Sequence, residues 1–227
     1  MGRFVMSKIK SYLDRLSDLS LDQTLLTSDC LVLFLSGSSD YTCAGLTAGQ
    51  LDLLYAICPS DYSVVSSNFP FNQRFNHMKS PQVSLLSASL SNIVYYWHTV
   101  LNPCFQKLLQ VHMSPLLETK EVIVVCKSSG VNMLTQWLNH LDNEISLPRF
   151  RIIALGPVSQ KLLDNKKLEV LVIKGKKDPY SQFLDSHQAD ILVDSDHYSY
   201  EYKEDVKGII HDWIRQSDKN RCNKRSL

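Results

Sequence analysis

The chain has 227 residues, of which 44% are hydrophobic and 21% charged, and its formal net charge is +1. This is ordinary for one globular domain, residues 1–227, and the near-neutral charge gives no electrostatic basis for binding nucleic acid or an anionic membrane. No apolar stretch approaches the ~20 residues that a membrane-spanning helix needs.

In chain order, residues 1–20 predict an amphipathic helix, because Ile9, Leu13 and Leu16 recur at helical spacing. This segment lacks the uninterrupted apolar core of a secretory signal, so we expect a cytoplasmic protein. Residues 30–35 then predict a buried strand, followed by the turn Ser-Gly-Ser-Ser at 36–39. Next come a helix and a short strand, over residues 46–58 and 62–65.

Residues 67–119 separate two strands by more than one crossover helix requires. Residues 81–111 carry apolar side chains at helical spacing, and Pro103 is expected to begin or kink a helix. This helical insertion has two interpretations. It can be a helix pair packed on the core or a partial pocket wall for an apolar acyl or aromatic group, and both can hold for different faces of the same helices. It contains no recognisable large lid.

The next strand, residues 121–125, runs into Cys126-Lys127-Ser128-Ser129-Gly130, and a helix is predicted over residues 131–140. A strand, a tight turn with a central serine and a helix form the layout of a nucleophile elbow. Such a turn requires small residues two positions to either side of its tip. Cys126 and Gly130 satisfy this for Ser128, whereas Ser129 would have Lys127 and Val131 as flanks. The pattern therefore selects Ser128, and it places Cys126 at a flank rather than at the tip.

Three further strands are expected over residues 151–155, 168–173 and 189–193, and a closing helix over residues 203–215. Strands that alternate with helices predict an α/β fold, a three-layer α/β/α sandwich around a mostly parallel sheet of about six strands. The tail, residues 217–227, is locally basic. We expect it to be disordered, with a binding tail as the alternative.

Polar residues follow the last two of these strands. Asp178 stands just beyond the strand at 168–173, in a Gly-x-x-Asp-Pro turn, and His197 follows the strand at 189–193. Asp194 and Asp196 are alternative acids, although an aspartate adjacent to the histidine is poorly placed to bond its Nδ1.

Serine, aspartate and histidine in this order, each after a strand, resemble the small α/β-hydrolases of the serine esterase and thioesterase type. The resemblance covers roughly residues 31–216. It departs from the commoner pattern at Cys126, where many relatives have glycine, and in the loop at 36–39, which lacks their His-Gly pair.

The resemblance implies a serine hydrolase that cleaves a carboxylic ester or thioester through an acyl-enzyme. Ser128 would be the nucleophile, His197 the general base, and Asp178 the group that orients the imidazole. The oxyanion would be bound by the backbone N–H groups of Ser129 and Ser38, although residues 36–39 could equally form a plain turn. The substrate would be a small-molecule or carrier-bound acyl compound.

Peptidase and lipase variants of this chemistry stay open from the sequence, as do two other functions. The same acyl-enzyme could pass its acyl group to an alcohol or amine, as in an acyltransferase or cyclase, or the chain could be a non-catalytic hydrolase-like binding protein. We predict no cofactor or metal, because there is no Gly-rich phosphate loop and no ligand cluster. The six cysteines lack the spacing of a disulfide framework, which favours free thiols in a reducing compartment.

Overall fold

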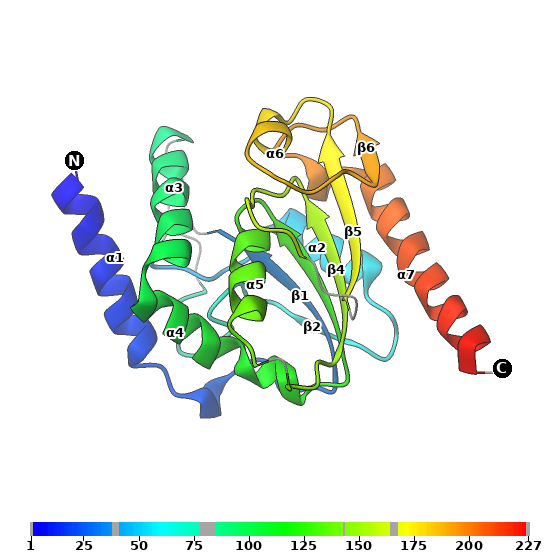
Figure 1. Cartoon of the computed structure of the whole chain (residues 1–227), viewed down its shortest axis with the longest axis horizontal. Helices are drawn as coiled ribbons and strands as arrows, with labels where there is room; N and C mark the ends of the chain where they lie inside the picture. Colours follow the sequence, from blue (N-terminus) through cyan, green and yellow to red (C-terminus); the bar gives the residue numbers. More distant parts are fainter. Residues whose placement is uncertain (1, 38–40, 78–84, 143, 164–167, 226–227) are drawn as a thin grey trace.

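The computed structural model describes residues 2–37, 41–77, 85–142, 144–163 and 168–225 (Figure 1); for helix residues 2–7, 85–91 and 222–225 it describes the backbone alone. A six-stranded sheet forms the centre, with the strand order β2-β1-β3-β4-β5-β6. Every neighbouring pair is parallel. The strands are β1 (Cys30–Ser36), β2 (Ser63–Val65), β3 (Glu121–Lys127), β4 (Arg149–Leu155), β5 (Leu168–Gly175) and β6 (Ile191–Val193).

Alternate strand residues enter two separate apolar cores, one on each face of the sheet. Val122 and Val124 belong to one core, whereas Ile123 and Val125 belong to the other. A strand buried on both faces has no need for polar alternation, which explains the continuous apolar runs in the sequence.

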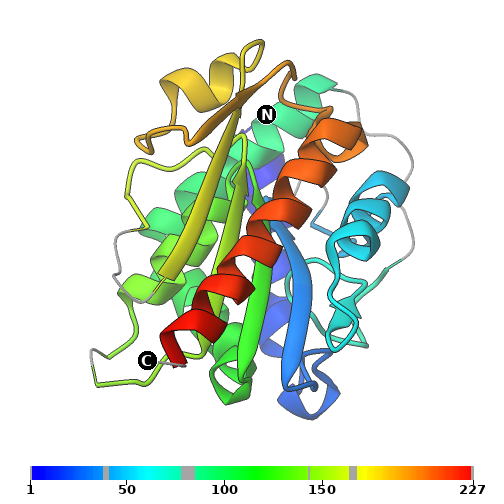
Figure 2. The ribbon, with the colours of Figure 1, turned by 90° about the vertical axis from the view of Figure 1, so that its right-hand side faces the viewer.

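Helices cover both faces. The first core lies under α1 (Gly2–Ser17), α3 (Leu85–Leu101), α4 (Pro103–Met113) and α5 (Gly130–Asn139). The second lies under α2 (Ala48–Ile57) and α7 (Glu204–Arg225), and Figure 2 shows α7 running diagonally across this face. The short helix α6 (Pro179–Phe183) follows the end of β5. The three-layer α/β/α sandwich with a parallel sheet is therefore confirmed.

The insertion at 67–119 contributes α3 and α4. Asn102 caps α4 by accepting hydrogen bonds from the amides of its first turn, and Pro103 occupies the first turn, so this proline begins a helix as predicted. Tyr95 and Phe105 are buried, with ring centroids 5.1 Å apart, and the Tyr95 hydroxyl lies 3.2 Å from that of Tyr12 on α1. These described side chains pack as a core between α1, α3 and α4.

The C-terminal helix is longer than predicted. The sequence predicts that it ends at residue 215, with a disordered tail over 217–227, but α7 continues to Arg225. The expectation is wrong for residues 217–225, while residues 226–227 lie outside the described residues. The physical reason is an ion-pair network that composition alone does not reveal. Asp218 lies 2.9 Å from Arg151 and 3.0 Å from Arg149, and Arg221 pairs with Glu121.

No helix within the described part of the chain combines the length and the apolar character needed to cross a bilayer. None of the cysteine side chains that the structure describes takes part in a disulfide.

Candidate active site

The candidate site lies where the strand order changes direction. From β1 the chain moves to β2 on one side, and then returns to place β3 on the other side. The connections that leave the carboxyl ends of β1 and β3 run to opposite faces of the sheet, to α2 and α5, and open parallel sheets bind their ligands at such a topological switch point. Gly37 follows β1 and Ser128 follows β3, so both stand at this edge of the sheet.

Ser128 occupies a strained backbone conformation, with a φ of 55°. A non-glycine residue at positive φ is uncommon and marks a position that its surroundings hold in place. The Ser128 N–H donates to the Leu155 carbonyl at 3.2 Å, and the Ser128 carbonyl accepts from the Val158 N–H at 3.1 Å. A Cβ at Gly130 would lie 2.0 Å from the Leu35 carbonyl oxygen, so only glycine allows the start of α5 to approach β1 this closely. The elbow geometry predicted around Ser128 is present.

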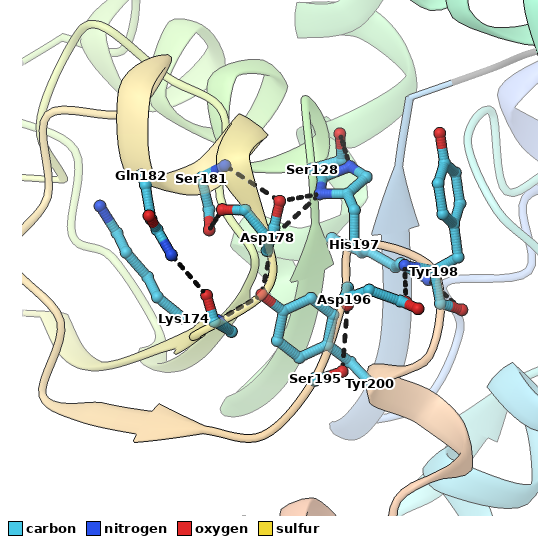
Figure 3. A network of polar contacts seen from close by, with 12 residues as sticks. Ser128, Lys174, Asp178, Ser181, Gln182, Ser195, Asp196, His197, Tyr198 and Tyr200 are labelled. Carbon is cyan, nitrogen blue, oxygen red and sulfur yellow. Dashed lines mark hydrogen bonds and ion pairs between the residues drawn. The ribbon is translucent and has the colours of Figure 1, made fainter.

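The structure brings the three predicted residues into one hydrogen-bonded chain (Figure 3). His197 Nε2 lies 3.0 Å from Ser128 Oγ, across 69 residues of sequence. His197 Nδ1 lies 3.0 Å from both carboxylate oxygens of Asp178. An ionised carboxylate only accepts, so Nδ1 carries the proton and Nε2 is left to accept from the serine hydroxyl. This assignment of the tautomer follows from the hydrogen-bond network.

Asp178 is completely buried, and its second partner is a residue that the sequence did not indicate. The Tyr200 hydroxyl donates to Asp178 Oδ2 at 2.7 Å and accepts from the Gly175 N–H at 2.6 Å. Burial opposes ionisation of Asp178, but hydrogen bonds from His197, Tyr200 and Ser181 outweigh it and lower the pKa of the carboxyl. The pKa of the Tyr200 phenol is raised by burial and by its bond to Asp178, so the tyrosine stays a neutral donor.

The two alternative acids have other partners. Asp196 accepts from the Tyr198 N–H at 2.9 Å and from the Ser199 hydroxyl at 2.8 Å, which closes the turn that contains the histidine. Asp194 forms an exposed ion pair with Lys177 at 2.8 Å. Of the three aspartates considered from the sequence, only Asp178 bonds to His197.

Of the two predicted oxyanion donors, Ser129 begins the elbow helix. Ser129 stands at the N-cap position of α5, where backbone N–H groups have no partner inside the helix and the helix dipole favours negative charge. Ser38 lies outside the described residues. Its neighbour Gly37 is pressed against the elbow, because a Cβ there would lie 2.0 Å from Ser129 Oγ and 2.9 Å from Asn92 Oδ1 of α3.

A buried ion pair joins the elbow strand to the histidine loop. Lys127 precedes Ser128 directly, and its Nζ lies 2.7 and 2.5 Å from the two carboxylate oxygens of Glu201. The same ammonium lies 3.5 Å from the Tyr198 carbonyl oxygen. Both charged side chains are buried, so each satisfies the other where water cannot. The pair therefore holds residues 198–201 against the end of β3.

Within the described residues, no group of three or more histidine, cysteine, aspartate or glutamate side chains is arranged to hold a metal ion.

No family model matches the chain. No curated protein matches its sequence significantly. Among solved structures, an uncharacterized protein from Bacillus cereus ATCC 10987 is 15% identical with a TM-score of 0.50, and the match covers 84% of this chain and 59% of that protein. A predicted CIB-like hydrolase from Thermoplasma acidophilum is 16% identical with a TM-score of 0.49, over 84% of this chain and 88% of that one. A carboxylesterase from Mesorhizobium loti is 17% identical with a TM-score of 0.43, over 83% and 89%.

At these identities a structural similarity concerns the fold alone. The chain spans 59% of the length of the Bacillus cereus protein. The six-stranded parallel α/β/α sandwich and the strand–turn–helix elbow expected from the sequence are both present, and the Bacillus cereus protein shares the overall fold.

Proposed function

We propose that the protein is a serine hydrolase that cleaves a carboxylic ester or thioester through an acyl-enzyme on Ser128. The observation that supports this most directly is the continuous chain of hydrogen bonds from Ser128 through His197 to Asp178, each 3.0 Å long. A serine hydroxyl is unreactive at its free pKa, and this arrangement is the one that removes its proton as it attacks.

In the proposed mechanism, Ser128 Oγ attacks the acyl carbon while its proton passes to His197 Nε2. The carbonyl oxygen takes the electron pair and becomes an oxyanion beside the Ser129 N–H. The carbon–oxygen or carbon–sulfur bond to the leaving group then breaks, and the leaving atom takes the proton from Nε2. Water attacks the acyl-enzyme by the same steps. Asp178 keeps the imidazole in the required tautomer and stabilises its cation.

The first test is labelling with a fluorophosphonate probe, followed by mass mapping of the modified peptide. We expect the probe on Ser128, and Ser128→Ala should abolish labelling and ester turnover while the protein stays folded. Ser114→Ala, at the opposite end of the sheet, is the matched control and should label like the wild type. Ester turnover that persists in Ser128→Ala would refute the assignment.

The second test separates hydrolysis from acyl transfer. The wild type is given an ester or thioester in the presence of an added alcohol or amine, and the products are quantified. A hydrolase yields free acid as the main product, whereas a transferase yields the new ester or amide.

A further inference from the structure

Two tyrosine rings pack against His197. The ring centroid of Tyr180 lies 4.9 Å from that of the imidazole, at an interplanar angle of 54°. The Tyr198 ring lies 5.5 Å away at 90°, and Figure 3 shows it on the other side of His197 from Asp178. Tyr180 is 41% exposed and Tyr198 52% exposed. Each ring is therefore partly exposed while it contacts the candidate base.

The apolar surface continues along α6. Phe183 stands three positions after Tyr180 on this short helix, and Leu184 is its C-cap, with its N–H bonded to the Tyr180 carbonyl oxygen at 2.8 Å. Phe183 is 80% exposed and Leu184 47% exposed. Together with Tyr198, these residues form what we name the aromatic rim. Exposed apolar side chains that gather beside a reactive centre, rather than singly over the surface, indicate a binding site.

The rim carries no charge of its own. The sequence of α6 is Pro-Tyr-Ser-Gln-Phe, without an ionisable acid or base other than the tyrosine. Lys177, just before Asp178, is paired with Asp194, and the carboxylate of Asp196 is engaged by Tyr198 and Ser199. The surface beside His197 is therefore suited to an uncharged group.

The position of the rim identifies the part of a substrate that would reach it. In acyl transfer the leaving group takes its proton from His197 Nε2, so its first atoms lie against the imidazole. The two partly exposed tyrosine rings adjoin that same imidazole. Aromatic rings prefer tilted or edge-to-face contacts at centroid separations of 4.5–7 Å, and two rings already adopt such contacts here.

We propose that the aromatic rim binds an aromatic ring carried by the alcohol or thiol part of the substrate. This inference rests on the proposed function, and it adds the substrate class: esters or thioesters of aryl-bearing alcohols or thiols. The acyl part lies on the other side of the reacting carbon and is not specified by the rim.

The test compares benzyl acetate with cyclohexylmethyl acetate. The two esters share the acyl group and have leaving groups of similar size, but only one carries an aromatic ring. We expect the wild type to prefer the benzyl ester. Tyr180→Leu should lower kcat/KM for the benzyl ester about tenfold, mainly through KM, and should lower it much less for the cyclohexylmethyl ester. Tyr180→Phe keeps the ring and should keep the preference. Tyr55→Leu, which removes an exposed tyrosine of α2, is the control.

Equal kcat/KM values of the wild type for the two esters would overturn the proposal, as would equal losses in Tyr180→Leu. A loss confined to esters presented on phosphatidylcholine vesicles would also overturn it, in favour of a lipid-binding surface. Failure of the proposed function is recognised separately, because a fluorophosphonate probe expels fluoride and needs no ring. If Ser128 is not labelled, the rim is tested directly by comparing the binding of benzyl alcohol with that of cyclohexylmethanol. Saturation-transfer NMR measures the binding of each alcohol. Equal binding would then overturn it.

Discussion

At the scale of single residues, the two aspartates near His197 have different tasks that substitution can separate. Asp178 bonds to the imidazole, whereas Asp196 accepts from the Tyr198 N–H within the turn that contains the histidine. We expect Asp178→Asn to lower kcat by about 10³–10⁴, because an amide stabilises the wrong imidazole tautomer. Asp196→Asn should cost far less. The comparison needs only ester turnover at neutral pH, and a larger loss in Asp196→Asn would contradict the assignment.

Tyr200 should act as a positioning residue through Asp178. In Tyr200→Phe the carboxylate loses a donor and the Gly175 N–H loses its acceptor, so the folded protein should lose ~1.5–3 kcal/mol of stability. We also expect kcat to fall about tenfold with little change in KM, because Asp178 would be less firmly held. Tyr202→Phe, at an exposed tyrosine of the same turn, is the control for both kinetics and thermal unfolding. Identical behaviour of the two variants would exclude the role.

The sequence could predict Ser128, Asp178 and His197 because each follows a strand, and strand ends meet at one edge of a parallel sheet. Tyr200 could not be predicted in this way. Its hydroxyl acts on Asp178, which is 22 positions earlier in the chain, and nothing in its neighbourhood distinguishes it from Tyr198 or Tyr202. The positions of the Tyr180 and Tyr198 rings could not be predicted for the same reason, because they are defined by contacts with His197 that only the folded chain forms.

At the scale of elements, local signals located most helices and strands to within a few residues. Pro103 was expected to begin a helix and does so, because proline fits the first turn. The prediction for the end of α7 is wrong because the locally basic tail, which includes Arg221, suggests a solvated terminus, whereas Ser217, Asp218 and Arg221 have partners in the fold. Their partners, Arg149, Arg151 and Glu121, lie on strands far away in the sequence, so no local pattern reveals them.

The same network predicts the effect of shortening α7. A chain that ends after residue 216 loses Asp218 and leaves Arg151, which is fully buried, with fewer partners. Because Asp218 is half exposed and Arg151 keeps its ion pair with Glu121, we expect a loss of about 1–2 kcal/mol, which should lower Tm by about 2–8 °C. A chain that ends after residue 222 keeps Ser217, Asp218 and Arg221, and it should unfold near the wild-type Tm. Equal Tm values for the two chains would show that the last turns of α7 do not stabilise the fold.

At the scale of the whole molecule, paired carboxylates make the folded state sensitive to acid. Burial disfavours ionised Glu121, but hydrogen bonds from Tyr62 and Arg221 outweigh it and lower the pKa to about 2. Because the unfolded value is about 4.3, this stabilisation is complete above about pH 5 and is lost as the pH falls through 4.3 towards 2. The pKa values of Asp178 and Glu169 are lowered too, so their contributions have the same sign.

Thermal unfolding between pH 7 and pH 2.5 checks this prediction. We expect Glu121→Gln to have a lower Tm than the wild type at pH 7, and the difference should shrink as the pH falls, because the wild-type carboxylate becomes protonated. Glu118→Gln, at an exposed side chain outside the network, should show a difference that does not change with pH. A Tm difference for Glu121→Gln that stays constant down to pH 2.5 would contradict the prediction.

The ion pair between Lys127 and Glu201 has a consequence for how this protein can change over generations. Loss of either partner alone strands a charge in the interior, next to the serine in one case and next to Tyr200 in the other. A double exchange for two apolar residues would avoid that cost, but each of its intermediates is penalised, so the two positions are coupled in the sense of strong epistasis. Descendants of this sequence should therefore keep both charges or lose both, and the residue before the nucleophile is far less free to drift than its position in a turn suggests.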